Sequence, residues 1–225
     1  MTPRPPGHRT GIALWTIAFT ALAAGSALAF TPLPAFDPDG SGPLYPDLAN
    51  GTTTEVPSLE AFHLDDLEIE LDGVLDDEAW GLAQTGWGFR ELDPERGAPA
   101  SVPSVFKVAY DDDAIYFAMA CYEYDMSNVS SYLSRRDQIE ASDIVSIYID
   151  PYHDKTTGYN FRVNPDGVLQ DAYLFDNGNR DTDWNAVWDA EVSRDANGWY
   201  VEIRIPLSQI RFKPEADMTW GLQAY

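Results

Sequence analysis

Short stretches in which every second residue is apolar constrain the fold of this chain more than any other feature of its sequence. They lie at residues 67–71, 106–110, 115–121, 145–149, 161–163, 188–192 and 199–205. Turn signals end them, as in Asp72-Gly73, Asp150-Pro151 and Asn164-Pro165-Asp166-Gly167. Alternate side chains of a strand point to opposite faces, so each stretch has one face to bury. Many such strands predict an all-β fold, an antiparallel and jelly-roll-like β-sandwich.

Helix signals are few and short. Asp76, Asp77 and Glu78 precede Trp80 and would lie in a first helical turn, where acidic side chains interact favourably with the helix dipole. Pro206 is suited to open another single turn. We therefore expect one or two short helices beside the strands.

The first 29 residues have the pattern of a signal peptide. Arg4, His8 and Arg9 make a positive start, an uncharged run follows, and Ala27-Leu28-Ala29 supplies the small residues that signal peptidase accepts. The alternative is an uncleaved anchor helix, for which the uncharged run 11–29 is only just long enough. We expect cleavage, and hence export to the periplasm, the outer membrane or the extracellular space.

Residues 30–64 are predicted to be a proline-rich linker, and residues 65–225 one sandwich domain. Six prolines lie between residues 32 and 57, and proline fixes φ and lacks the N–H that a strand ladder needs. Residues 37–42 are similar to the start of an EF-hand loop, but Leu48 stands where that loop needs a bidentate Glu. The strand pattern of residues 218–225 continues to the last residue, so we expect the sandwich to be truncated at its C-terminus and the chain to be an N-terminal fragment of a longer protein.

Acidic residues outnumber basic ones by 37 to 14, which gives a formal net charge of −23. The sequence has no cluster of basic residues that could bind a phosphate backbone, so we predict no nucleic-acid partner. The single cysteine excludes an internal disulfide and a cysteine-based zinc cluster. A structural calcium ion is one hypothesis for the loop that carries Asn177, Asn179, Asp181 and Asp183, and an ordinary polar loop is the other.

Five motifs follow one another in the second part of the chain. They are Leu71-Asp72-Gly73-Val74-Leu75-Asp76 with Trp80, the hairpin at 108–117, the strand at 143–150, Phe161-Arg162-Val163-Asn164, and Gly198-Trp199 continuing to Pro206. Each motif alone is weak, but the ordered set resembles the family 9 carbohydrate-binding modules. The resemblance extends over residues 67–225.

This resemblance implies a non-catalytic β-sandwich, often containing calcium, that is attached to xylanases and other polysaccharide-degrading enzymes. It also implies a sugar held between two aromatic rings, because sugar C–H faces are apolar, with fixed polar groups at the hydroxyls. Arg162 and Asn164 stand where the family has the arginine and asparagine of that polar set. Because alternate side chains of a strand point to opposite faces, the side chains of Arg162 and Asn164 are expected on the face opposite to Phe161 and Val163.

The ligand-binding residues that we predict are Arg162, Asn164, Ser146, Tyr148 and Trp184. Ser146 stands at the position of a family glutamate, and Trp184 lies in a polar loop, where the alternative role is a lid over the core edge. An ion pair with a carboxylate is the alternative for Arg162. The family's first clamp tryptophan has no counterpart in residues 135–141, and the second falls beyond the last residue, so the resemblance supports the fold more than the sugar clamp.

Two functions fit these patterns. One is a carbohydrate-binding module in a protein of carbohydrate catabolism, with a xylan-type or glucan-type oligosaccharide or chain end as ligand and C-terminal domains of the same parent as partners. The other is a structural or interaction domain at the N-terminus of an outer-membrane protein, with the sugar site lost. The sequence has no G-x-S-x-G, P-loop or H-E-x-x-H motif, so we expect no catalysis in this segment. A glycoside hydrolase is the parent that the first function implies, and a long envelope protein is the parent that the second implies.

Overall fold

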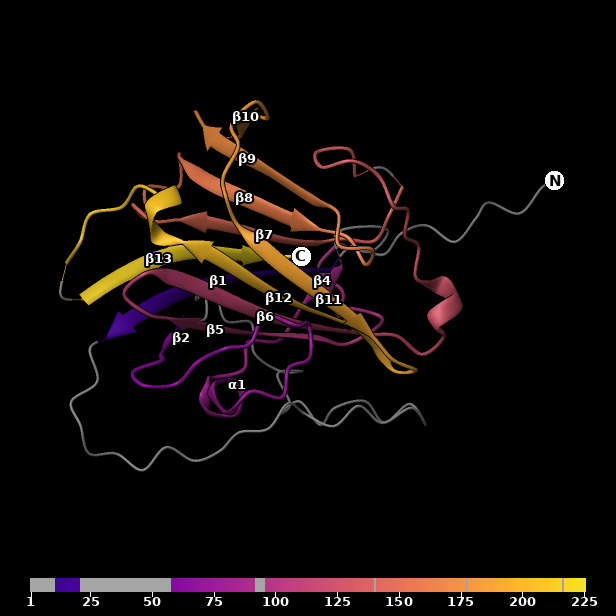
Figure 1. Ribbon diagram of the computed structural model, residues 1–225. Helices are drawn as coiled ribbons and strands as arrows, with labels where there is room; N and C mark the ends of the chain where they lie inside the picture. Colours follow the sequence, from indigo (N-terminus) through magenta and orange to yellow (C-terminus); the bar gives the residue numbers. More distant parts are fainter. Residues whose placement is uncertain (1–10, 21–57, 92–95, 140, 177, 216) are drawn as a thin grey trace.

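Two β-sheets pack against each other in the computed structural model, which describes residues 11–20, 58–91, 96–139, 141–176, 178–215 and 217–225 (Figure 1). The first sheet has the strand order β10-β9-β8-β7-β13-β1-β2, and β4 pairs with β1. The second has the order β11-β12-β6-β5-β3. This architecture confirms the predicted all-β sandwich.

The strands of the first sheet are β10 (Asn179–Asp181), β9 (Leu169–Phe175), β8 (Gly158–Val163), β7 (Val145–Asp150), β13 (Asp217–Ala224), β1 (Gly11–Thr20), β2 (Ser58–Glu60) and β4 (Arg90–Glu91). Those of the second are β11 (Asp189–Arg194), β12 (Gly198–Pro206), β6 (Ala114–Tyr122), β5 (Ser104–Tyr110) and β3 (Phe62–His63). The pairings are antiparallel except for β1 with β2 and β3 with β5, which are parallel. Within the described residues, one α-helix, α1 (Glu78–Leu82), and two 3-10 turns, Met126–Asn128 and Leu207–Gln209, accompany them.

The main core lies between the two sheets. Ile147 of β7 and Phe161 of β8 meet Val201 and Ile203 of β12 in one cluster of buried side chains. These are apolar positions of the alternating stretches, so the alternation correctly predicts the inner face of these strands. Trp199 also belongs to this cluster. The strand prediction is wrong for residues 67–71, which form no strand, although Leu67 and Ile69 pack against the cluster around Trp80.

A second cluster covers the other face of β5 and β6. Helix α1 brings Trp80 against Ala109 of β5 and Ala118 of β6. Both faces of these two strands are therefore buried, and the burial is nearly continuous along each of them. This arrangement forces polar side chains of the second sheet, such as Lys107, into the protein interior.

Some residues of the predicted signal peptide and linker form strands. Gly11–Thr20 pairs with β13, and Ile17 is fully buried. Ser58–Glu60 and Phe62–His63, which fall at the end of the predicted linker, contribute β2 and β3. Cleavage after Ala29 stays a prediction, and residues 30–57 lie outside the described part of the chain. None of the helices in the described ranges has the length and apolar character needed to cross a membrane.

Candidate functional site

The outward face of the first sheet gathers polar side chains from four neighbouring strands. Because Val145, Ile147, Phe161 and Val163 point into the core, the residues between them point outward. The register places Ser146 opposite Arg162, Tyr148 opposite Asn160, Arg162 opposite Gln170, and Arg180 opposite Leu174. Three of the predicted ligand residues, Ser146, Tyr148 and Arg162, thus share one face, which we call the outward face of β7–β10.

A hydrogen-bonded chain crosses this face. Arg180 donates from Nη2 to Oδ1 of Asn160 at 2.7 Å, and Asn160 donates from Nδ2 to Oγ of Ser146 at 2.9 Å. Asn160 is fully buried, whereas Arg180 is exposed. Neither was among the residues predicted from sequence. The strand parity that identifies Arg162 applies equally to Asn160, two positions earlier, whereas nothing in the sequence places the three-residue strand of Arg180 beside them.

Arg162 lies at the centre of the face with part of its donor capacity unused. Its Nη1 donates to Oε1 of Gln170, while its buried Nε has no hydrogen-bond partner. Burial lowers the pKa of the Arg162 guanidinium, and the nearby Arg180 lowers it further. Arg162 forms no ion pair with any described residue, so the alternative role as the partner of a carboxylate has no support there.

Two tyrosine rings border these polar groups. The rings of Tyr148 and Tyr225 lie 5.4 Å apart between centroids, tilted by 56°. The backbone of Tyr225 pairs with Ser146, with N donating to the Ser146 carbonyl at 2.9 Å. Tyr225 follows β13 in register, so its position beside Tyr148 depends on a pairing between distant strands that sequence alone does not reveal.

The loop between β6 and β7 adds a hollow of about 370 Å³ lined by Tyr132, Ser134, Gln138 and Ala141. Tyr132 is 60% exposed. The absence of an aromatic residue in 135–141 therefore does not leave this loop without one, because Tyr132 lies three residues earlier and lines the same hollow.

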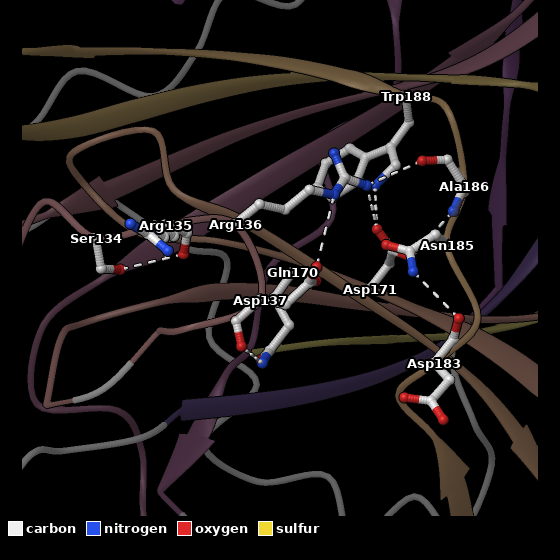
Figure 2. A network of polar contacts seen from close by, with 10 residues as sticks. All are labelled: Ser134, Arg135, Arg136, Asp137, Gln170, Asp171, Asp183, Asn185, Ala186 and Trp188. Carbon is white, nitrogen blue, oxygen red and sulfur yellow. Dashed lines mark hydrogen bonds and ion pairs between the residues drawn. The ribbon is translucent and has the colours of Figure 1, made fainter.

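The Arg136 side chain anchors this loop to the sandwich through three contacts (Figure 2). The Arg136 guanidinium donates to the carboxylate of Asp171 and, at 2.9 Å, to the Ala186 carbonyl, and it lies over the Trp188 ring. Asp171 is buried, and Trp188 Nε1 donates to it at 2.8 Å. Arg136 therefore holds the loop to the sandwich. Figure 2 shows its side chain reaching toward Asp171 and Trp188.

A second anchor joins the loop to the outward face. Nε2 of Gln170 donates to the carbonyl of Asp137 at 3.1 Å, and the N–H of Asp137 donates to the carbonyl of Leu169 at 2.9 Å. Gln170 also accepts from Arg162. One glutamine side chain therefore connects Arg162 to the loop that carries Tyr132.

Asn164 and Trp184 lie apart from the outward polar groups. Asn164 is fully buried; its Oδ1 accepts from the N–H of Asp166 and Val168, and its Nδ2 donates to the Tyr132 carbonyl at 3.0 Å. It holds the turn after β8 and the start of the Tyr132 loop. The Trp184 ring packs 5.1 Å from Tyr159, against the core. Ligand contact by either residue stays a prediction.

The described residues bring no group of three or more His, Cys, Asp or Glu side chains together around a possible metal position. Of the loop predicted to hold calcium, Asn177 lies outside the described residues, and Oδ1 of Asp181 accepts from the N–H of Asp183 at 3.0 Å. A structural calcium ion in this loop stays a prediction.

Comparison with known proteins identifies one matching family and similar solved structures. A family model described as Carbohydrate family 9 binding domain-like matches residues 71–225. No curated protein matches the chain. A carbohydrate-binding module family 9 from Caldicellulosiruptor kristjanssonii in complex with glucose is similar at 16% identity, with 73% of this chain and 84% of that chain covered and a TM-score of 0.46. The same source gives a complex with cellotriose, at 18% identity, 72% and 82% coverage and a TM-score of 0.45.

Proposed function

The chain belongs to the Carbohydrate family 9 binding domain-like family, and from this premise we propose that it is a non-catalytic carbohydrate-binding module whose ligand lies on the outward face of β7–β10. The observation that carries the proposal is the gathering of Arg162, Ser146 and Tyr148 beside a second tyrosine ring on one face. A face of this kind joins an apolar ring surface with fixed donors and acceptors, which is what a sugar needs.

The contacts would divide according to their chemistry. The apolar C–H face of a sugar ring would stack on Tyr148 or Tyr225, and its hydroxyls would exchange hydrogen bonds with Arg162 and Gln170. Oligosaccharide binding of this type buries little area, so it depends on side chains that are already held in place. The bonds from Asn160 to Ser146 and from Arg162 to Gln170 supply that order.

The test is calorimetric titration with xylo-oligosaccharides and cello-oligosaccharides, because we propose that the parent protein acts on xylan-type or glucan-type polysaccharides. We expect heat of binding with at least one of them, and a loss of about tenfold or more in affinity for Tyr148→Ala, since one stacking aromatic contributes about 1–3 kcal/mol in recognition of this kind. Tyr124→Ala removes an exposed tyrosine outside this face and serves as the matched control. A folded protein that binds no glycan would overturn the proposal.

We also propose that the protein is exported. The support is the positive start, the uncharged run and Ala27-Leu28-Ala29. Mass spectrometry of the protein recovered from an exporting host should give an N-terminus at Phe30. A protein that keeps residues 1–29 in that experiment would contradict export by cleavage. Cleavage would also remove β1, so the precursor and the mature protein would differ at the edge of β13.

A further inference from the structure

The outward face of β7–β10 is cationic although the chain as a whole is strongly acidic. Arg162 and Arg180 both reach onto it, in a protein with a formal net charge of −23. At the outward strand positions of these four strands, the one described carboxylate belongs to Asp150. Its oxygens accept from the backbone N–H groups of Asp154 and Lys155 in the turn that follows β7.

Neither arginine on this face is neutralised within the described chain. Arg162 donates to the amide oxygen of Gln170, and Arg180 donates to that of Asn160. Arg136 differs, because it forms an ion pair with the Asp171 carboxylate. Two guanidinium groups that meet only neutral acceptors, in a chain with many carboxylates available, point to an anion supplied from outside.

In the absence of a ligand, Arg162 and Arg180 lower the stability of the fold. Arg162 is half-buried, its Nε lacks an acceptor, and the like charge of Arg180 is close enough to disfavour its protonated form. A bound carboxylate would relieve the repulsion and accept charge-assisted hydrogen bonds, for which the planar guanidinium is well shaped. The exposed Arg180 gives such a ligand access from solvent.

We propose that the ligand of this face is a carboxylated sugar, a uronic-acid residue of an oligosaccharide, whose carboxylate lies against Arg162 and Arg180 and whose ring lies on Tyr148. This inference rests on the proposed carbohydrate-binding function and names its substrate class. The hydroxyls of the sugar remain available to Gln170, and the one described carboxylate on the face, Asp150, accepts hydrogen bonds from the turn after β7.

Calorimetric titration of the whole chain tests this with oligouronates and neutral oligosaccharides of equal length. We expect the oligouronate to bind about tenfold or more tightly, and this advantage to shrink as sodium chloride rises from roughly 0.05 to 0.5 M, because salt screens the attraction. Arg180→Gln should abolish most of the advantage. Arg211→Gln removes the same charge from an exposed position outside this face and should leave it unchanged.

The outcomes separate the two proposals. Equal or tighter binding of the neutral oligosaccharide overturns the uronate assignment and leaves the carbohydrate-binding function standing. Absence of binding to every glycan, by a protein with an unchanged circular dichroism spectrum, overturns both. A sulfated oligosaccharide that binds as tightly as the oligouronate overturns the choice of a carboxylate. Because Arg180 is exposed, its variant is expected to fold even if Arg162→Gln does not.

Discussion

Glu202 accepts a hydrogen bond from the indole Nε1 of Trp80 at 2.7 Å, between two buried side chains that lie 122 residues apart in the sequence. The other carboxylate oxygen accepts from the backbone N–H groups of Asp72 and Gly73. Burial raises the pKa of Glu202, and these three hydrogen bonds oppose that rise. The contact connects the first and last of the five sequence motifs and holds α1 on the second sheet.

Replacement of this carboxylate tests how much it stabilises the fold. Glu202→Gln should lower the free energy of unfolding by about 1–3 kcal/mol, because one of its three N–H partners would face an amide N–H instead of an acceptor. Urea denaturation measures the change. Glu191→Gln is the matched control, since Glu191 lies opposite Glu202 in the β11–β12 register but is exposed. Equal stability of the Glu202→Gln variant and the wild type would mean that the carboxylate is dispensable.

Two features exclude a side chain at position 73: a left-handed backbone conformation and the close approach of β11. The φ of Gly73 is +80°, and a Cβ there would lie 2.8 Å from backbone atoms of Val192 and Ser193. We expect Gly73→Ala to lower the free energy of unfolding by about 2–4 kcal/mol, through left-handed strain and displacement of β11. Thermal denaturation is the measurement.

Gly167 separates the two contributions. Its φ is +75°, close to that of Gly73, but a Cβ there would meet nothing within 4 Å. Gly167→Ala should therefore show the conformational cost alone, about 1 kcal/mol. If both substitutions cost the same, the close approach of Gly73 to β11 contributes nothing.

Lys107 predicts a pH dependence of stability. Burial lowers the pKa of its ammonium from 10.5 to about 8, so above pH 8 the folded chain releases a proton that the unfolded chain still holds. Stability from this group therefore rises with pH between 8 and 10.5, by at most about 1.4 kcal/mol per pH unit. The pKa of Cys121, raised by burial from 9.0 to about 12, acts in the opposite direction above pH 9.

The useful window is therefore pH 8 to 9. Urea denaturation of the wild type and of Lys107→Met should give a difference in unfolding free energy that shifts in favour of the wild type as the pH rises through this window. A constant difference would mean that the Lys107 ammonium does not change its pKa on folding. Making the same comparison in a Cys121→Ala background removes the opposing contribution of the thiol.

Strand alternation explains which parts of the site could be predicted. The parity of Phe161 and Val163 places Arg162 outward, and the same argument places Ser146 and Tyr148 beside it once β7 pairs with β8. Parity ceases to apply where the strand ends. Asn164 already belongs to the turn after β8, and its side-chain oxygen accepts hydrogen bonds from backbone N–H groups of that turn.

Tertiary neighbours account for what sequence reasoning missed. Tyr132 and Tyr225 enter the site through a loop and through the pairing of β13 with β7, and neither relation leaves a local pattern. Lys107 and Glu202 occupy polar positions of strands whose second face is covered by α1. A polar residue at an alternating position predicts an exposed face only when no further layer covers it.

Arg136 forms an ion pair with the buried carboxylate of Asp171 and so holds its loop to the sandwich. Arg136→Met should lower the free energy of unfolding by about 1–3 kcal/mol, because it leaves the buried Asp171 carboxylate with the N–H groups of Trp188 and Ala186 but no cation. Hydrogen exchange should also become faster in residues 132–138, since Arg136 holds that loop to the sandwich. Arg135→Met, at the exposed neighbouring position, controls for the loss of charge.

A double-mutant cycle distinguishes the ion pair from simple loss of packing over Trp188. Asp171→Asn combined with Arg136→Met removes both charges, so it should cost less than the sum of the two single substitutions. Additive costs would show that Arg136 stabilises the loop through its contact with the indole ring, which lies 5.8 Å from the guanidinium carbon, and not through the carboxylate. In that case exchange in residues 132–138 would be unaffected by Asp171→Asn alone.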